Sequence, residues 1–132
     1  MSGKNPLRTA SELALAGRVG EAIDFLEAIL ARTRSSEERP ANTSLLARTA
    51  GVHCVGVGDL EQAALYFEEA VATAGHDATP LLALAGLRWQ QGQADSARSC
   101  LERAESIAQS SADAEALQMV ADIRAGWASD DG

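Results

Sequence analysis

The pattern that predicts the fold lies in the stretch Gly58-Asp59-Leu60-Glu61-Gln62-Ala63-Ala64-Leu65-Tyr66-Phe67-Glu68-Glu69-Ala70. After a turn glycine, an alanine is followed four residues later by a large apolar residue and three residues after that by another apolar residue. Spacings of four and three place side chains on one face of a helix, so the pattern predicts an amphipathic helix. It occurs three times, at Ala22, Leu26 and Ile29, at Ala63, Phe67 and Ala70, and at Ala97, Leu101 and Ala104.

The three copies recur at a nearly constant interval. Their turn glycines are Gly17, Gly58 and Gly92, so the successive intervals are 41 and 34 residues. A period near 34 residues is typical of stacked helix–turn–helix units. The polar segment 35–40, which ends in proline, is predicted to be a loop and accounts for most of the seven extra residues of the first interval.

Caps and helix breakers predict seven helices. Asn5, Thr43, Asp59 and Thr79 are predicted to cap the helices that follow them. The segment 44–57 carries conflicting signals, because its glycines alternate with valines as in a strand. The repeat register favours a helix there and places Gly51 where two helices approach closely. The predicted helices cover residues 6–16, 21–34, 44–57, 60–74, 80–91, 94–109 and 112–128.

The segment 58–70 closely resembles the second helix of a tetratricopeptide repeat (TPR). The helix before it keeps the small residues of this family's pattern at Ala47, Ala50 and Gly51 but lacks the usual Trp and Tyr. An unrelated helical bundle is the alternative. The resemblance implies an all-α, right-handed helix–turn–helix superhelix of about seven helices in one domain over 1–132. Its repeats would lie at about 5–34, 43–75 and 79–109, with a capping helix at 112–128.

In this family the first helices of successive repeats line a concave groove. Carried over by register, the lining here would be Leu7, Arg8, Ser11, Leu15, Leu45, Arg48, Thr49, Val52, Val55, Leu82, Gly86, Trp89 and Gln90. This largely apolar lining suits the apolar face of an amphipathic helix or an extended apolar segment. Trp89 would be its anchor, unless it packs against the seventh helix. Arg8 and Arg48 would hold an acidic group of the ligand, the alternative being two solvated charges.

One well-known subclass of the family captures a peptide's C-terminal carboxylate with Lys and Asn side chains on successive first helices. The matching positions here are Leu7, Ser11, Thr49, Thr79 and Ala83. None of these residues carries a cationic or amide group, so the resemblance does not extend to carboxylate capture.

Composition and charge limit the function classes further. The net charge of −8 argues against nucleic-acid binding, which needs clustered Lys and Arg. No apolar run reaches ~18 residues and residues 1–18 lack a signal-peptide pattern, so we expect no membrane insertion and a cytoplasmic location. Ten Arg against a single Lys is typical of a GC-rich bacterial genome. Cys54 and Cys100 are then expected to be reduced, buried thiols.

The residues with catalytic or metal-binding side chains do not form a recognisable site. His53, Cys54, His76 and Cys100 lack the paired spacing of zinc ligands, and adjacent helical residues point about 100° apart. The carboxylates Glu68 and Glu69 are interpreted as a solvated surface pair. We therefore expect no catalytic residue, no metal and no cofactor.

The sequence thus predicts a non-enzymatic protein–protein interaction module, an adaptor, scaffold or chaperone that binds a peptide or an amphipathic helix. Two alternatives stay open. The size and the apolar groove resemble small type III secretion chaperones that cradle the C-terminal helix of a needle subunit. A self-associating structural scaffold is the second alternative, with a homodimer formed through outer-wall residues Ile23, Leu65 and Tyr66.

Overall fold

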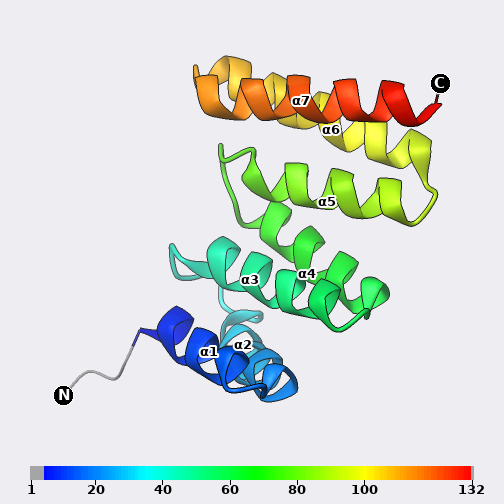
Figure 1. Cartoon of the computed structure of the whole chain (residues 1–132). Helices are drawn as coiled ribbons and strands as arrows, with labels where there is room; N and C mark the ends of the chain where they lie inside the picture. Colours follow the sequence, from blue (N-terminus) through cyan, green and yellow to red (C-terminus); the bar gives the residue numbers. More distant parts are fainter. Residues whose placement is uncertain (1–4, 132) are drawn as a thin grey trace. The chain divides into compact units, whose positions relative to one another are not determined.

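The computed structural model describes residues 5–131. This part of the chain contains seven α-helices and no strand, which confirms the all-α prediction (Figure 1). The helices are α1 (Pro6–Leu15), α2 (Val19–Thr33), α3 (Thr43–Gly56), α4 (Leu60–Ala72), α5 (Thr79–Gln90), α6 (Ala94–Ser110) and α7 (Ala114–Asp131).

The helices belong to two compact units, the first ending at Ala74 and the second beginning at Gly75. In the first unit α1 packs against α2 and α3 against α4, while α2 and α1 also contact α3. In the second unit α5 packs against α6, and α6 packs against α7. The first six helices therefore form three pairs of consecutive helices, and the seventh packs against the second helix of the last pair.

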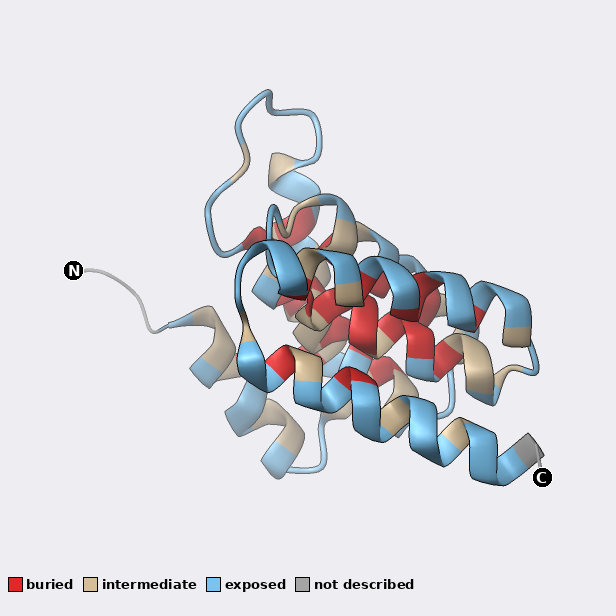
Figure 2. Cartoon of the chain, turned by 90° about the horizontal axis from the view of Figure 1, so that it is seen from above, coloured by how far each residue is buried: buried red, intermediate tan, exposed pale blue. Residues whose placement is uncertain are grey.

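The repeated positions form the core of both units, as the periodicity predicts. The three alanines that begin the pattern, Ala22, Ala63 and Ala97, have no exposed surface. The large apolar residue four positions later is also buried in every copy. Figure 2 shows the buried residues of the chain in red. Small residues at the first position let the paired helices approach closely, while the larger side chain fills the space between them.

Helix α3 resolves the conflict between strand and helix signals in favour of the helix. Its buried residues follow the helical period at Leu46, Ala47, Ala50 and Cys54, and this buried face outweighs the local alternation of glycine and valine. Gly51 is also buried, and a Cβ atom at this position would lie 2.5 Å from Cε1 of Phe67. The close approach of α3 and α4 that the repeat register predicts at Gly51 is therefore present.

Two of the four predicted caps are confirmed. The side chains of Asn5 and Asp59 accept hydrogen bonds from the backbone N–H groups of Leu7 and Gln62. The other two predictions are wrong. Helix α5 begins at Thr79 itself, whose backbone N–H donates to Oδ1 of Asp77 at 2.9 Å. Helix α3 likewise begins at Thr43, and the Thr43 hydroxyl donates to the carbonyl oxygen of Pro40 at 2.7 Å. Thr43 is buried, so its hydroxyl finds its partner inside the preceding turn.

The same turn closes four helices, and its geometry explains where α7 begins. The residue with positive φ is Gly17, Gly58 or Gly92 in the first three turns and Ala112, with φ 54°, in the fourth. In each turn the next residue donates its N–H to a carbonyl near the end of the preceding helix, at 2.9 Å. The seventh helix therefore starts at Ala114, after this turn, and not at residue 112.

Replacing Ala112 with glycine is expected to raise the free energy of unfolding by about 0.5–1 kcal/mol. Left-handed backbone costs an alanine about 1–2 kcal/mol, which exceeds the additional unfolded-state entropy of a glycine. Urea unfolding followed by circular dichroism measures the change. Ala28→Gly, an exposed position inside α2, should instead lower stability by about 1 kcal/mol. Equal losses in both variants would contradict the turn geometry.

Candidate functional site

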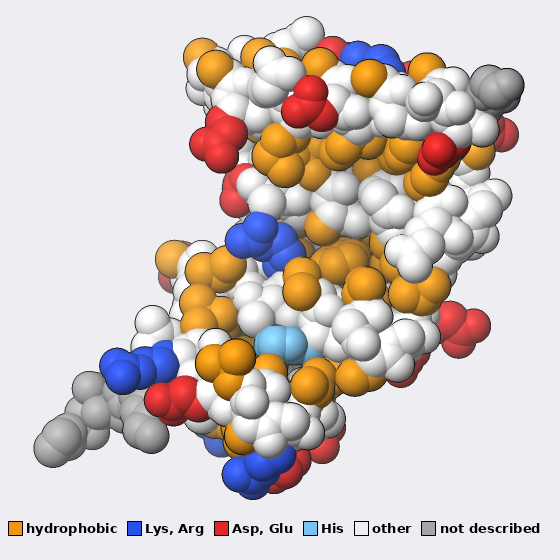
Figure 3. Space-filling model, in the orientation of Figure 1, with side chains coloured by type: hydrophobic (Ala, Val, Ile, Leu, Met, Phe, Trp, Pro, Cys, Tyr) orange, Lys and Arg blue, Asp and Glu red, His pale blue; other side chains and the backbone are white. Residues whose placement is uncertain are grey.

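The candidate partner-binding surface of the first unit lies on α1 and α3, which contact each other. We call this surface the inner face. It consists of Leu7, Arg8, Ser11, Leu15, Leu45, Arg48, Thr49, Val52 and Val55. Large apolar side chains are exposed here: Leu15 is 86% exposed, Val52 54% and Leu45 39%. Figure 3 shows orange hydrophobic side chains over α1 and α3 on the side that faces the viewer.

The polar residues of the inner face differ in their hydrogen bonds and ion pairs. Arg8 lies 3.6 Å from the carboxylate of Glu12, one helical turn away, and both side chains are exposed. Thr49 donates its hydroxyl to the carbonyl oxygen of Leu45 in its own helix. Arg48 is half-buried and makes no hydrogen bond or ion pair with any residue in 5–131. The structure therefore does not join Arg8 and Arg48 through a shared acidic partner.

The predicted groove residues of the second unit lie on α5. Leu82 is buried, so it presents almost no side-chain surface, whereas Gly86 and Gln90 are exposed. Trp89 is half-buried and stacks on Trp127 of α7, with ring centroids 4.4 Å apart and planes 6° apart. The sequence predicts either that Trp89 anchors a ligand in the groove or that it packs against the seventh helix, and the structure contains the contact with the seventh helix.

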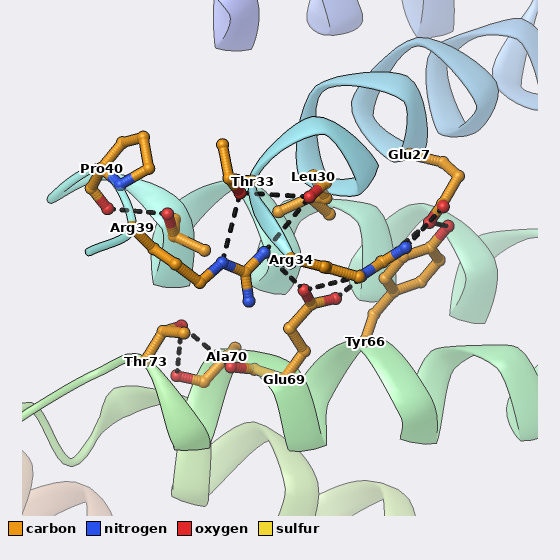
Figure 4. A network of polar contacts seen from close by, with 11 residues as sticks. Glu27, Leu30, Thr33, Arg34, Arg39, Pro40, Tyr66, Glu69, Ala70 and Thr73 are labelled. Carbon is orange, nitrogen blue, oxygen red and sulfur yellow. Dashed lines mark hydrogen bonds and ion pairs between the residues drawn. The ribbon is translucent and has the colours of Figure 1, made fainter. Parts of the chain in front are cut away.

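A polar network that the sequence does not reveal joins α2 and α4 of the first unit (Figure 4). The Arg34 guanidinium donates to both Glu27 and Glu69, with distances between 2.7 and 3.0 Å. Arg39 donates to Glu69 at 2.7 Å, and the Tyr66 hydroxyl donates to Glu27 at 2.8 Å. The interpretation of Glu69 as part of a solvated pair is therefore wrong, because its side chain is only 14% exposed and has two cationic partners.

This network sets the titration of its carboxylates. Burial alone would raise the pKa of Glu69, but the hydrogen bonds from Arg34 and Arg39 outweigh it and hold the pKa below its ordinary value. The hydrogen bond from Arg34 likewise lowers the pKa of Glu27. Burial and the hydrogen bond to Glu27 raise the pKa of Tyr66. Both carboxylates are therefore charged near neutral pH, and the network fastens the segment after α2 to α4.

The outer-wall residues predicted to mediate self-association lie next to this network. Ile23, Leu65 and Tyr66 all line a groove of about 660 Å³ between α2 and α4. Leu65 is 58% exposed, but Tyr66 is buried and its hydroxyl is engaged by Glu27. Leu65 and the half-buried Ile23 thus provide the exposed apolar surface on this side of the unit.

Both cysteines are buried and neither forms a disulfide within residues 5–131, which is consistent with their expected role in packing. Among residues 5–131, no group of three His, Cys, Asp or Glu side chains is arranged to hold a metal ion. None of the helices in this part of the chain has the length and apolar character needed to span a membrane.

The thiol of Cys54 is expected to resist alkylation in the folded protein. Burial raises its pKa to about 11, so the reactive thiolate is rare at neutral pH, and the surrounding side chains exclude the reagent. Mass spectrometry after brief iodoacetamide treatment should find Cys54 unmodified in buffer and modified in guanidinium chloride. Rapid alkylation in buffer would contradict the packing of α3 on α4.

Comparison with known proteins supports the repeat architecture. The family model described as Tetratricopeptide repeat matches residues 55–123. Among solved structures, the crystal structure of MamA superposes with a TM-score of 0.66 at 16% sequence identity. The match covers 87% of this chain and 62% of the MamA chain, so it establishes a shared fold with part of a longer protein. The search of curated proteins found no matching sequence.

The family match covers more than half of the chain and includes the stretch that contains the repeat pattern. The helix pairs, their buried alanines and their common turn give the structural basis of that match. Proteins built from these repeats are generally interaction modules without catalytic activity. The chain therefore belongs to the tetratricopeptide repeat family and is, in general terms, a protein–protein interaction module.

Proposed function

We propose that this protein binds an amphipathic helix, or an extended apolar segment, of a partner protein on the inner face of α1 and α3. The exposure of Leu15, Leu45 and Val52 is the observation that carries the proposal. These side chains lie on two helices in contact with each other, and clustered apolar side chains on a surface are typical of interaction sites. Burying them against a partner stabilises a complex through the hydrophobic effect.

Arg48 indicates that the partner segment also carries an acidic residue. It lies one turn from both Leu45 and Val52, and it is half-buried without an acidic partner among residues 5–131. Partial burial of an unpaired charge is unfavourable, and a carboxylate from the partner would compensate for it. The proposed ligand is therefore an apolar segment that carries Asp or Glu beside its apolar residues.

Two matched substitutions test this surface. Val52 and Val57 are almost equally exposed, at 54% and 55%, but Val57 follows the end of α3 and lies outside the inner face. We expect Val52→Glu to weaken binding of a captured partner at least tenfold, because a carboxylate would be buried against apolar side chains. Val57→Glu should bind as the unaltered protein does. Equal binding by both variants would contradict the proposal.

The two alternative functions, a secretion-type chaperone and a self-associating scaffold, predict other results. A secretion-type chaperone should co-purify with a small helical subunit whose C-terminal helix occupies the inner face. A self-associating scaffold should increase in mass with concentration in analytical ultracentrifugation, and Leu65→Glu on the outer groove should abolish the increase. We also propose a cytoplasmic location and a non-enzymatic role, on the sequence evidence given above.

A further inference from the structure

Helix α7 consists of two differently anchored halves. Its first half buries Ala116 and Val120, and the helix packs against α6. Between residues 121 and 130, by contrast, every side chain is exposed or half-buried. Figure 2 shows this half, next to the label C, in pale blue and tan. Segments with few buried apolar contacts open locally at low free energy, so this half is less firmly held than the first.

Within the described part of the chain, three aromatic or polar contacts join the second half to α5 and α6. Trp127 stacks on Trp89, whose indole Nε1 also donates to Asp130 at 3.4 Å. Arg124 pairs with Glu105 at 3.1 Å, with both side chains partly exposed to solvent. This pair is bidentate, but solvent screens partly exposed ion pairs and weakens their contribution to stability. The aromatic stack is therefore the main contact that closes this half of α7 over α5.

The packing beneath the second half is also incomplete. A cavity of about 270 Å³ separates it from α6. The residues that line this cavity are Arg98, Leu101, Glu102, Arg124, Trp127 and Ala128. Helix α7 therefore lies close against α6 at Ala116 and Val120 but leaves a gap next to Trp127.

Gly126 weakens the helix directly before Trp127. A Cβ atom at this position would meet no other atom within 4 Å, so packing does not require a glycine here. Glycine is nevertheless among the least favourable residues inside a helix. Gly126 thus lowers the stability of α7 next to Trp127, the residue that stacks on Trp89.

We propose that residues 121–130 form a latch that opens while Ala116 and Val120 stay packed, and that opening uncovers the ring face of Trp89. In the closed state Trp127 occupies this aromatic surface, so the chain's own helix blocks access to it. An aromatic side chain of a partner would compete with Trp127 for the same ring face. This inference concerns the second unit alone and does not rest on the binding proposed for α1 and α3.

The chain contains only two tryptophans, which gives the latch a specific signal. Two indoles stacked at 4.4 Å should produce an exciton couplet in the circular dichroism spectrum. Trp89→Phe and Trp127→Phe should each abolish it, which assigns the signal. On heating, we expect the couplet to disappear at a lower temperature than the helical signal.

Substitutions at glycine test whether the early loss of the couplet is the latch. Gly126→Ala should reduce the open population about fivefold and move the loss of the couplet to higher temperature. Gly20→Ala is the control, because Gly20 also lies in a helix with no atom near its Cβ position but belongs to α2. It should leave the couplet unchanged. Loss of the couplet together with the helical signal, or no effect of Gly126→Ala, would overturn the proposal.

Discussion

Replacing Gly51 with valine is expected to lower the free energy of unfolding by about 3 kcal/mol, the largest effect we foresee for any single substitution. The new Cβ would lie 2.5 Å from Cε1 and 2.6 Å from Cδ1 of Phe67, well inside contact distance. Phe67 is 3% exposed, so its ring has no free space into which it can turn. Overpacking of this kind costs about 1–3 kcal/mol and sometimes more, and valine adds two further methyl groups.

Urea unfolding followed by circular dichroism measures this effect, and Gly86→Val is the control. Gly86 lies inside α5 with no atom within 4 Å of its Cβ position, so valine there should change stability by about 0.5 kcal/mol or less. The second variant, Phe67→Leu in the Gly51→Val background, should restore part of the loss because the smaller side chain relieves the clash. Similar stability of Gly51→Val and Gly86→Val would contradict the close packing of α3 on α4.

Replacing Glu69 with glutamine is expected to destabilise the protein by about 2 kcal/mol at pH 7. The substitution removes the carboxylate that accepts hydrogen bonds from both Arg34 and Arg39, and it leaves these cations without their shared partner. Charge-assisted hydrogen bonds contribute more than neutral ones, and Glu69 is mostly shielded from water. Chemical unfolding at neutral pH measures the loss.

The same variant should lose part of the pH dependence of stability. The pKa of Glu69 in the folded protein lies below its ordinary value of 4.5, so its stabilisation is fully present above about pH 4.5. That stabilisation is lost as the pH falls through the lowered pKa. The difference between the unaltered protein and Glu69→Gln should therefore shrink on acidification from pH 6 to pH 3.

Glu68→Gln is the matched control, because it makes the same chemical change at the neighbouring, exposed residue. We expect it to change stability by about 0.5 kcal/mol or less at neutral pH. A loss at Glu68→Gln as large as that at Glu69→Gln would show that overall charge, and not the network with Arg34 and Arg39, determines the effect.

The sequence predicts the helices and their pairing because both follow from local spacing. A period of four and three residues defines each buried face, and the recurrence of that pattern defines the repeat. At Gly51 the register of the repeat predicts that two helices approach closely. The structure shows that the side chain in contact with this position is Phe67. Buried positions of this kind depend on residues that lie within a few turns of one another.

The polar network and the tryptophan stack cannot be predicted from local residue spacing. Arg39 and Glu69 are 30 residues apart, and their pairing depends on the path of the segment between α2 and α3. Arginines and glutamates are common on helix surfaces, so neither residue type signals the contact. The stack of Trp89 on Trp127 depends on how α7 is rotated about its axis, and the residue spacing within α7 does not define that rotation. From the sequence, both positions of Trp89 remain open.

The proposal that a partner docks on α1 and α3 is tested most directly by site-specific photocrosslinking. A photoreactive amino acid at Leu15 or Val52 would lie on the inner face, whereas one at Leu65 would lie on α4, with comparable exposure to that at Val52. We predict that Leu15 and Val52 crosslink to an apolar, acid-bearing segment of the partner and that Leu65 does not. Crosslinks to the partner from Leu65 alone would contradict the account.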